Sequence, residues 1–454
     1  MHHAGMPQVF RELIENLFDK KYIRLLCATE TFAVGLNMPT KSVIFPYLYK
    51  FDGISMRPLY SHEYGQMAGR AGRRGIDTAG DIYHMANLIQ NGNNAITITP
   101  YRKMLTGNPQ ILSSKFQIHY NLLLRLISVH NFDFHAFISK SMLSDSIQKE
   151  LSYITDALNV AKERFDKKIV HMKTPQDILE QYMDLQSNIH SYKGKKRKAM
   201  RREIARLENI HRYLQSDKVK MEEKNILEKE VQRLEHQVQN IQTYIQSEIE
   251  LILKILEKHL FIEQNEDKTY TLAEKGSYAT HIQEIHCLAI ADVLSERQFD
   301  RLSDSEFVAV LSAFARVSMP DDQRVTGIDQ LEASSNVTSV LSKIQNSYHY
   351  YEGIEARHQL SFTENSDLHW DLCDLMFDWC KADTDEACKR VYEEAQLYKI
   401  SLGEFIKAIL KINNIARELE KVALRQFNMI LLDKIKKVPL LTLKSVVTNQ
   451  SLYL

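Results

Sequence analysis

The chain has 454 residues, with 58 Lys and Arg against 58 Asp and Glu, and 44% of its residues are hydrophobic. This length predicts more than one domain. The zero net charge excludes a protein that binds polyanions through its overall charge, so any surface that binds nucleic acid must be a local patch. No apolar run reaches the ~20 residues that cross a bilayer, so we predict no membrane-spanning helix and no membrane partner. Five scattered cysteines without a CxxC pair are typical of an intracellular protein, whether cytoplasmic or nuclear.

The first 98 residues alternate between helical and extended patterns. Apolar residues recur at helical spacing across residues 7–20. Three short apolar runs, YIRLLCAT (22–29), SVIFPYL (42–48) and GDIYHMA (80–86), are typical of strands. This alternation predicts an α/β unit with a mostly parallel sheet.

From residue 99 onward the pattern is mainly helical. A heptad seam predicts that one long helix packs along a single stripe, with the segment from Leu151 to Phe165 as its partner in an antiparallel hairpin over 150–258. The run LFIEQNEDKTYTLAEKG (260–276) indicates two short strands around a polar turn, followed by a helical bundle. The seam consists of Leu227, Val231, Leu234, Val238, Ile241 and Ile245.

Two further clusters have more than one interpretation. The basic run 193–202 reads as a break between helices, and it could bind RNA phosphates, serve as a localisation signal, or form the solvated tip of the hairpin. Cys373, Cys380 and Cys388 are seven and eight residues apart, whereas structural zinc sites space their ligands by two to four, so we predict helical thiols and no metal.

Arginines and glycines crowd into QMAGRAGRRGID (66–77), where Asp77 closes the run. Arginine offers a planar fork that matches phosphate oxygens, and glycines let the backbone approach a phosphate closely. Arg70 and Arg73 are therefore candidate arginine fingers for a transferring phosphoryl group. In a second stretch, Thr29, Glu30 and Thr31 follow an apolar run, which suits phosphate binding at a strand-to-helix connection.

Together these stretches resemble a known family. HHAGM (2–6), LLCATETFAVGLNMPTKSVIF (25–45) and EYGQMAGRAGRRGID (63–77) are similar to motifs IV to VI of DExH-box superfamily 2 helicases, and most closely to the superkiller and exosome-cofactor RNA helicases. KFDGISMRPLYSHEY (50–64) resembles the strand-separating hairpin that this family places between motifs V and VI. LSSKFQIHYNLLLRLI (112–127) resembles the start of its winged helix, and LSDSEFVAVLSAF (302–314) and SLYL (451–454) resemble its C-terminal DSHCT domain.

The resemblance implies a fold class: a partial α/β RecA-like domain followed by a mainly α region. Residues 1–98 would form an N-terminally truncated second RecA-like domain, and 99–149 a winged-helix-like region. Residues 150–258 would form a helical stalk insertion without the β-barrel knob that this family carries there, because no strand-rich block occurs in it. Residues 259–454 would form a DSHCT-like helical bundle that includes the hairpin at 260–276.

The resemblance also implies roles for single residues. Arg70 and Arg73 would face the γ-phosphate, and Gln66 would contact the nucleotide. The wider nucleotide site would consist of Gly35, Gln66, Gly69, Arg70, Arg73 and Asp77. The nucleic-acid contacts would be Thr29, Glu30, Thr31, Asn37, Phe51, Asp52 and Gly53.

The implied activity is that of the C-terminal half of an ATP-dependent RNA helicase that moves 3′ to 5′ in RNA processing or turnover. ATP with Mg²⁺ would be the cofactor, with the Mg²⁺ site in a first motor domain, since the chain contains no GxxxxGK[ST] loop. Single-stranded RNA or a duplex junction would be the substrate, and exosome-like nucleases or adaptors would be partners. The alternatives are a catalytically incomplete relic that binds RNA or protein, and a DNA-unwinding repair relative. Whether the chain is a fragment or a truncated product is left open.

Overall fold

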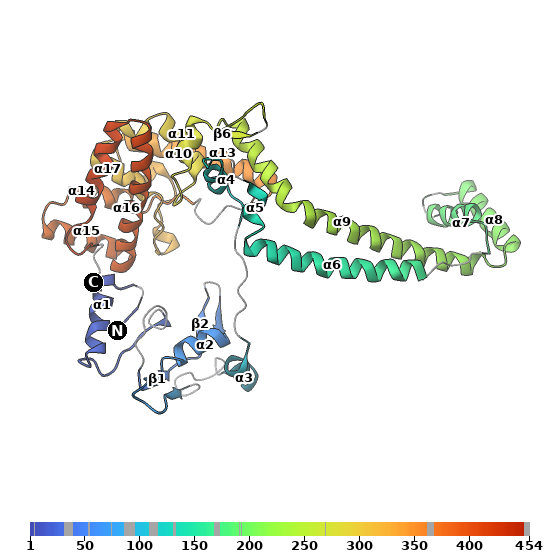
Figure 1. The fold of residues 1–454 in the computed structure, drawn as a ribbon, viewed down its shortest axis with the longest axis horizontal. Helices are drawn as coiled ribbons and strands as arrows, with labels where there is room; N and C mark the ends of the chain where they lie inside the picture. The colour runs from blue at the N-terminus through green and yellow to red at the C-terminus, as the bar shows by residue number, and fades with distance from the viewer. Residues whose placement is uncertain are drawn as a thin grey trace. The chain divides into compact units, whose positions relative to one another are not determined.

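The computed structural model divides the chain into two compact units (Figure 1). The first unit comprises Met1–Leu112, His119–His130 and Leu256–Leu454, and the second comprises Ser113–Ile118 and Asn131–Ile255. The predicted fold class is confirmed: an α/β part is followed by a mainly helical chain. The structure describes residues 1–3, 5–30, 40–52, 55–73, 75–85, 96–108, 117–129, 133–167, 173–189, 191, 193–267, 269–360 and 367–448.

The α/β part of the first unit is built on a parallel pair of strands. Strand β1 pairs with β4 so that Phe45 lies opposite His84, and β2 and β3 form an antiparallel hairpin. Apolar side chains from β1, the hairpin, α2 and α3 form a small core around Phe45 and Met104. The elements are α1 (Gln8–Asp19), β1 (Ser42–Phe45), β2 (Tyr49–Phe51), β3 (Met56–Pro58), α2 (Ser61–Ala68), β4 (Asp81–His84) and α3 (Ile98–Thr106).

The predicted strand at 22–29 is wrong among the described residues. This segment makes a single parallel bridge, between His2 and Ala28, in which the His2 amide donates to the Cys27 carbonyl and the Thr29 amide donates to the His2 carbonyl. Leu25 is 76% exposed. An apolar run forms a strand only where neighbouring strands take up its backbone hydrogen bonds, and one short bridge does not do so.

The helical part of the first unit is densely packed. Its largest buried side chain, Trp379, donates its indole N–H to the Thr442 carbonyl at 3.0 Å, which joins α14 to α17. Helix α12 begins at a capping box of Ser303 and Glu306. The elements are α4 (Tyr120–Ile127), β5 (Ile262–Gln264), β6 (Tyr270–Leu272), α10 (Glu274–Ala279), α11 (Cys287–Ser295), α12 (Asp304–Ser312), α13 (Ser335–His358), α14 (Cys373–Lys381), α15 (Asp385–Leu397), α16 (Leu402–Arg425) and α17 (Met429–Thr442).

Helix α4 packs against elements that follow the long helical insertion. It contacts α10, α11 and β6, and the side chain of Asn121 donates to the carbonyls of Ala279 and Ile282 at 2.9 and 2.7 Å. The expected winged-helix region at 99–149 is therefore not self-contained, since α4 completes its core with residues after 256. The exact domain boundaries remain a prediction.

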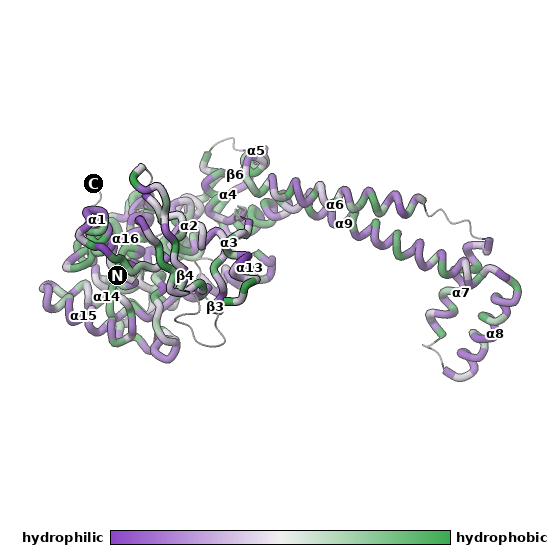
Figure 2. The backbone as a smooth tube through the Cα atoms, turned by 90° about the horizontal axis from the view of Figure 1, so that it is seen from below, coloured by the Kyte–Doolittle hydropathy of each residue, from purple (hydrophilic) through white to green (hydrophobic). Residues whose placement is uncertain are grey.

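Helices are the only regular secondary structure among the described residues of the second unit. Helices α6 and α9 run side by side, with Leu158 and Ala161 packed against Leu234, which agrees with the heptad stripe (Figure 1). Hydrophobic and hydrophilic residues alternate along both helices, as one-sided packing requires (Figure 2). The elements are α5 (Phe134–Ile138), α6 (Met142–Lys167), α7 (Gln176–Asn188), α8 (Lys195–Ile210) and α9 (Leu214–Lys258), the last of which continues past the boundary of the unit.

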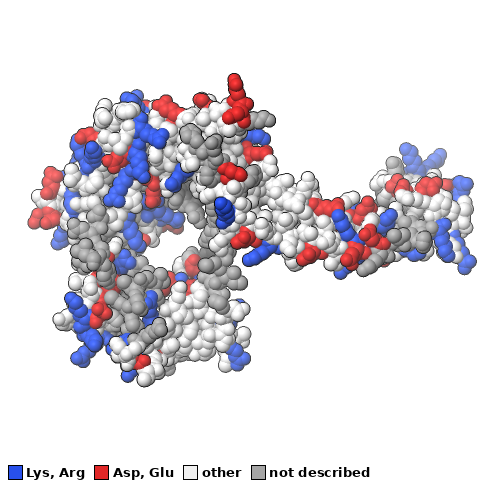
Figure 3. All heavy atoms as spheres, in the orientation of Figure 1, with Lys and Arg blue, Asp and Glu red and all other residues white. Residues whose placement is uncertain are grey.

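The predicted break in the basic run 193–202 is confined to its first two residues, and the rest of the run is helical. Gly194 takes a left-handed φ of 67°, and α8 begins at Lys195 with no acidic residue in its first turn. Leu207 of α8 packs with Leu179, Tyr182 and Leu214, so the run is folded into a small helical module, and its Lys and Arg side chains lie on the surface of the second unit (Figure 3). No helix in the described part of the chain is long and apolar enough to cross a membrane.

Candidate nucleotide and nucleic-acid site

The arginine segment emerges from the end of helix α2 and runs beside Thr40. The helix ends at Gly69, whose amide donates to the Gly65 carbonyl at 2.9 Å. The Thr40 amide then donates to the Arg70 carbonyl at 2.8 Å, and the Gly72 amide donates to the Thr40 carbonyl at 2.6 Å. These bonds place the arginines directly beside the residue that leads into β1.

Glycine is required at two positions here. Gly72 has a φ of 92°, in the region that residues with a Cβ rarely adopt. A Cβ on Gly80 would lie 2.4 Å from the carbonyl carbon of Ala71, which is far inside van der Waals contact. The two glycines therefore let two backbone segments pack against each other, just before Arg73.

Asp77 holds Arg73 with a two-pronged contact. The Arg73 Nε donates to Asp77 Oδ2 at 2.7 Å and its Nη2 donates to Oδ1 at 2.8 Å, while the Arg73 amide donates to Oδ2 at 3.0 Å. A guanidinium has two hydrogen-bonding edges, and Asp77 occupies the Nε–Nη2 edge. The N–H groups directed away from Asp77 are those that could contact phosphate oxygens.

Arg73 and Asp77 keep each other ionised. The Arg73 side chain, through its hydrogen bonds, lowers the pKa of Asp77 to about 2, and Asp77 in turn raises the pKa of Arg73. Both groups are therefore ionised throughout the physiological pH range. The arrangement offers an oriented, permanently cationic group, which is what stabilisation of a transferring phosphoryl group requires.

The other predicted nucleotide residues lie on the same segment or outside the described residues. Gln66 is exposed on the last turn of α2, just before Gly69, and Arg70 is half-buried. Gly35 lies outside the described residues, as do the predicted nucleic-acid contacts Thr31, Asn37 and Gly53. Gln66, Gly69, Arg70, Arg73 and Asp77 thus share one short segment of the chain, and within it the structure pairs Arg73 with Asp77.

The predicted nucleic-acid residues divide into two kinds. The aromatic ring of Phe51 is opposite Met56 in the β2–β3 hairpin, and the two residues are 58% and 60% exposed, so the hairpin presents an apolar end. The carboxylates instead have protein partners. Glu30 Oε2 lies 2.6 Å from Lys50 Nζ, and Asp52 accepts from the Ser55 amide at 2.9 Å. Thr29 is exposed, and its amide belongs to the bridge with His2.

Glu63 is a site residue that was not predicted from the sequence. It accepts two hydrogen bonds of 2.8 Å from Arg57, one of 2.8 Å from the Tyr60 amide and one of 3.2 Å from Lys50. The hydrogen bonds from Arg57 are the main reason that the pKa of Glu63 falls to about 2. A sequence signal was present, since a glutamate three residues after the residue preceding a helix commonly caps it.

His84, which joins three elements of the α/β part, was also not predicted from the sequence. His84 of β4 lies 2.7 Å from the Tyr101 hydroxyl through Nδ1 and 3.2 Å from the Tyr64 hydroxyl through Nε2. Burial lowers its pKa, which favours the neutral ring. Because it connects β4 to α2 and α3, His84 supports the position of the helix that carries Gln66.

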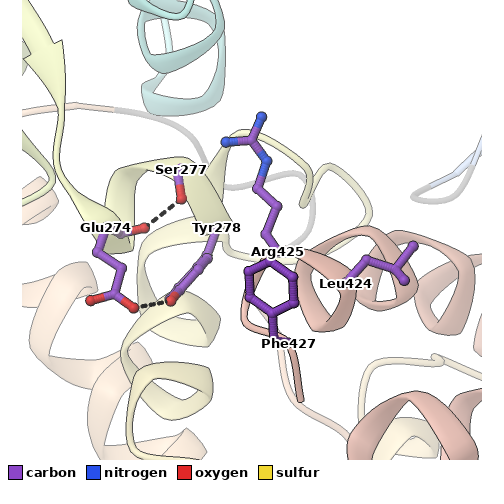
Figure 4. A pocket seen from close by; sticks show the side chains of 6 residues that line it. All are labelled: Glu274, Ser277, Tyr278, Leu424, Arg425 and Phe427. Atoms are coloured by element: carbon purple, nitrogen blue, oxygen red, sulfur yellow. Dashed lines mark hydrogen bonds between the residues drawn. The ribbon is translucent and has the colours of Figure 1, made fainter. Parts of the chain in front are cut away.

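A pocket of about 500 Å³ lies on the helical part of the first unit (Figure 4). None of its residues is among the predicted site residues. Tyr278 and Ser277 both donate to Glu274 across one side of it. Among the described residues, no three His, Cys, Asp or Glu side chains gather as a metal site would require. The pocket is lined by Glu274, Ser277, Tyr278, Leu424, Arg425 and Phe427.

Comparison with known proteins finds two domain matches in this chain. Residues 1–75 match the helicase conserved C-terminal domain, and residues 269–449 match the DSHCT (NUC185) domain. The antiviral helicase SKI2 of Saccharomyces cerevisiae is 44% identical over 129 residues, which are 28% of this chain and 10% of that protein. The exosome RNA helicase MTR4 of Homo sapiens is 34% identical over 170 residues, 37% of this chain and 16% of that protein.

A third relative matches over a longer stretch. The ATP-dependent RNA helicase mtr4 of Schizosaccharomyces pombe is 32% identical over 193 residues, 42% of this chain and 16% of that protein. The chain thus matches less than a fifth of the length of each of these three helicases. The two domain matches, in this order along the chain, and the similarity to these helicases confirm the predicted resemblance to the C-terminal half of the superkiller and exosome-cofactor DExH-box helicases.

Proposed function

We propose that this chain supplies the second half of the motor of an ATP-dependent RNA helicase that moves 3′ to 5′ on RNA during RNA processing or turnover. The observation that carries the proposal is the Arg73–Asp77 pair, an ionised guanidinium that Asp77 orients on a segment whose glycines allow tight packing of the backbone. The names of the relatives support RNA as the substrate and an exosome-type nuclease as a partner.

In the proposed reaction Arg73 stabilises negative charge that develops on the γ-phosphoryl group of ATP. Asp77 keeps the guanidinium pointing in one direction, so little reorganisation is needed when the bond breaks. Arg70 would supply a second positive charge, and Gln66, Gly69 and Gly35 would contact the nucleotide. ATP would bind together with Mg²⁺, which would neutralise phosphate charge, and the residues that hold the ion would belong to the first motor domain.

On the RNA side, we propose that Thr29, Thr31 and Asn37 contact the backbone of the loaded strand, and that Phe51, with Gly53 at the turn, meets the duplex junction. Glu30 and Asp52 have a different proposed role. Carboxylates repel phosphate, and both of these lie against basic residues of the hairpin. We therefore propose that they shape the hairpin rather than bind RNA directly.

The test is an Arg73→Ala substitution in an enzyme that joins this chain to a first motor domain with a P-loop. RNA-stimulated ATP hydrolysis should fall by roughly 10³ to 10⁵, as it does when an arginine finger is absent, while RNA affinity stays within about threefold. Arg102→Ala is the matched control, because Arg102 is an exposed arginine of α3 outside the arginine segment. A loss of less than tenfold for Arg73→Ala would show that Arg73 is not the finger.

A further inference from the structure

The β2–β3 hairpin places two cations opposite each other. Lys50 and Arg57 are direct partners in the antiparallel register, so their side chains lie on the same face of the hairpin. Like charges directly opposite each other destabilise a strand pair. The hairpin therefore needs an anion on this face.

Glu63 of helix α2 supplies that anion to both strands. Its carboxylate accepts from Arg57 through both oxygens and from Lys50 through Oε1, and its side chain is only 12% exposed. The contact with Arg57 is bidentate, which fixes direction as well as distance. One side chain of α2 thus connects both strands of the hairpin to the helix.

The surrounding groups leave Arg57 little freedom. Its guanidinium carbon lies 3.7 Å from the centre of the Tyr60 ring, its Nε is 3.6 Å from Asp52 Oδ2, and its Nη1 also donates to the Pro58 carbonyl at 3.2 Å. Lys50 is bridged further to Glu30. A side chain held by a carboxylate, a ring and a carbonyl cannot change rotamer without breaking several contacts.

The same helix carries the hairpin anchor at one end and the arginine segment at the other. Glu63 lies in the first turn of α2, and Gly69 and Arg70 follow directly from its last turn. An eight-residue helix is about 12 Å long at 1.5 Å per residue, and its internal hydrogen bonds make it move as one body. A displacement of Arg70 and Arg73 would therefore displace the hairpin as well.

We propose that Glu63 is a positioning residue that couples the nucleotide-facing arginine segment to the strand-separating hairpin. This inference rests on the proposed helicase function and adds to it a physical connection between ATP hydrolysis and strand separation. Glu63 contacts neither nucleotide nor RNA. Its role is to make the hairpin follow α2.

The functional test uses Glu63→Gln in the enzyme with both motor domains. The amide keeps the size of the side chain but loses its charge and one acceptor oxygen. Duplex unwinding should fall at least about tenfold, while RNA-stimulated ATP hydrolysis and its KM for RNA stay within about twofold. Arg57→Lys should have the same effect because it removes the bidentate contact, and the double variant should be no worse than either single one.

Glu15→Gln is the matched control, since Glu15 is a buried carboxylate paired with His2 in the same α/β part but away from the hairpin. Any effect of Glu15→Gln should fall equally on unwinding and ATP hydrolysis. Equal losses for Glu63→Gln, or no loss of unwinding, would overturn the coupling role.

Hydrogen exchange on the 454-residue chain gives a second readout that needs no catalysis. In Glu63→Gln the amides of Asp52 and Leu59, which close the hairpin, should exchange at least about tenfold faster, while the α2 amides of Tyr64 and Gly69 keep their protection. Loss of protection in both elements would mean that Glu63 only supports the fold. If the wild-type two-domain enzyme fails to unwind RNA, the proposed function is refuted, and the exchange pattern still decides whether Glu63 anchors the hairpin.

Discussion

Acid should loosen the β2–β3 hairpin. The reason is Glu63, whose pKa falls from an ordinary 4.5 to about 2, chiefly because Arg57 donates hydrogen bonds to its ionised form. A carboxyl group whose pKa is lower in the folded state contributes stability that is fully present above its unfolded pKa. That contribution is lost as the pH falls from about 4.5 towards 2.

The size of the effect follows from the same shift. A difference of about 2.5 pH units corresponds to about 3 kcal/mol at 1.36 kcal/mol per unit. Solvent screening reduces this value, because the Arg57 and Lys50 side chains are 19% and 29% exposed. We therefore expect about 1–2 kcal/mol of hairpin stability from ionised Glu63, with more than half of it lost between pH 7 and pH 3.

Two measurements on the 454-residue chain test this reasoning. An NMR titration of the Glu63 carboxyl carbon should give a pKa near 2. Hydrogen exchange, corrected for the intrinsic pH dependence, should show a smaller free energy of opening for the Leu59 amide at pH 3 than at pH 7. The Glu63→Gln chain is the control, because without the titrating group its opening free energy should not follow this pH dependence. A Glu63 pKa near 4.5, or a wild-type change below about 0.5 kcal/mol, would refute the analysis.

Three further predictions concern other parts of the molecule. Asp77→Asn in the two-domain enzyme should reduce ATP hydrolysis by roughly 10- to 100-fold, less than removal of Arg73, because the arginine remains but loses its orientation; an effect as large as that of Arg73→Ala would contradict an orienting role. Asn121→Ala should destabilise the chain by about 1–3 kcal/mol in chemical denaturation, since two buried carbonyls lose their donor; an unchanged midpoint would argue against this bond. Replacing residues 150–250 by a short linker should leave the first unit folded by circular dichroism and hydrogen exchange, because the seam packs on itself; a deletion that unfolds the rest would show a shared core.

Local patterns predicted much of the fold. The heptad stripe at Leu234 predicted the packing of α9 on α6, since a repeat of apolar residues fixes which side of a helix is buried. Alternation around a polar turn predicted the pairing of β5 with β6. The resemblance of residues 50–64 to the family's hairpin predicted β2 and β3, between which Asp52 accepts from the Ser55 amide. Each of these features depends on residues that are close in sequence or on one continuous stripe.

Contacts between distant segments could not be predicted in this way. The run 22–29 is apolar enough for a strand, but strand formation depends on partners elsewhere in the chain, and only His2 bridges to it among the described residues. The basic run 193–202 contains no apolar stripe of its own, so its helix became apparent only through the packing of Leu207 on α7. Asn121 finds its acceptors more than 150 residues away, beyond the helical insertion.

The candidate site shows the same division. The sequence predicts a phosphate-binding role for Arg70 and Arg73, because clustered arginines and glycines suit phosphate, and this role stays a prediction. Asp77 is near enough in the chain to pair with Arg73, and the structure shows that contact. Only the tertiary structure decided which cations Glu63 would hold. Lys50 and Arg57 become partners through the register of two strands, and α2 then brings one carboxylate against both. Hydrogen bonds of this kind need side chains on separate elements to be placed to within a few tenths of an ångström, and sequence spacing does not set that placement.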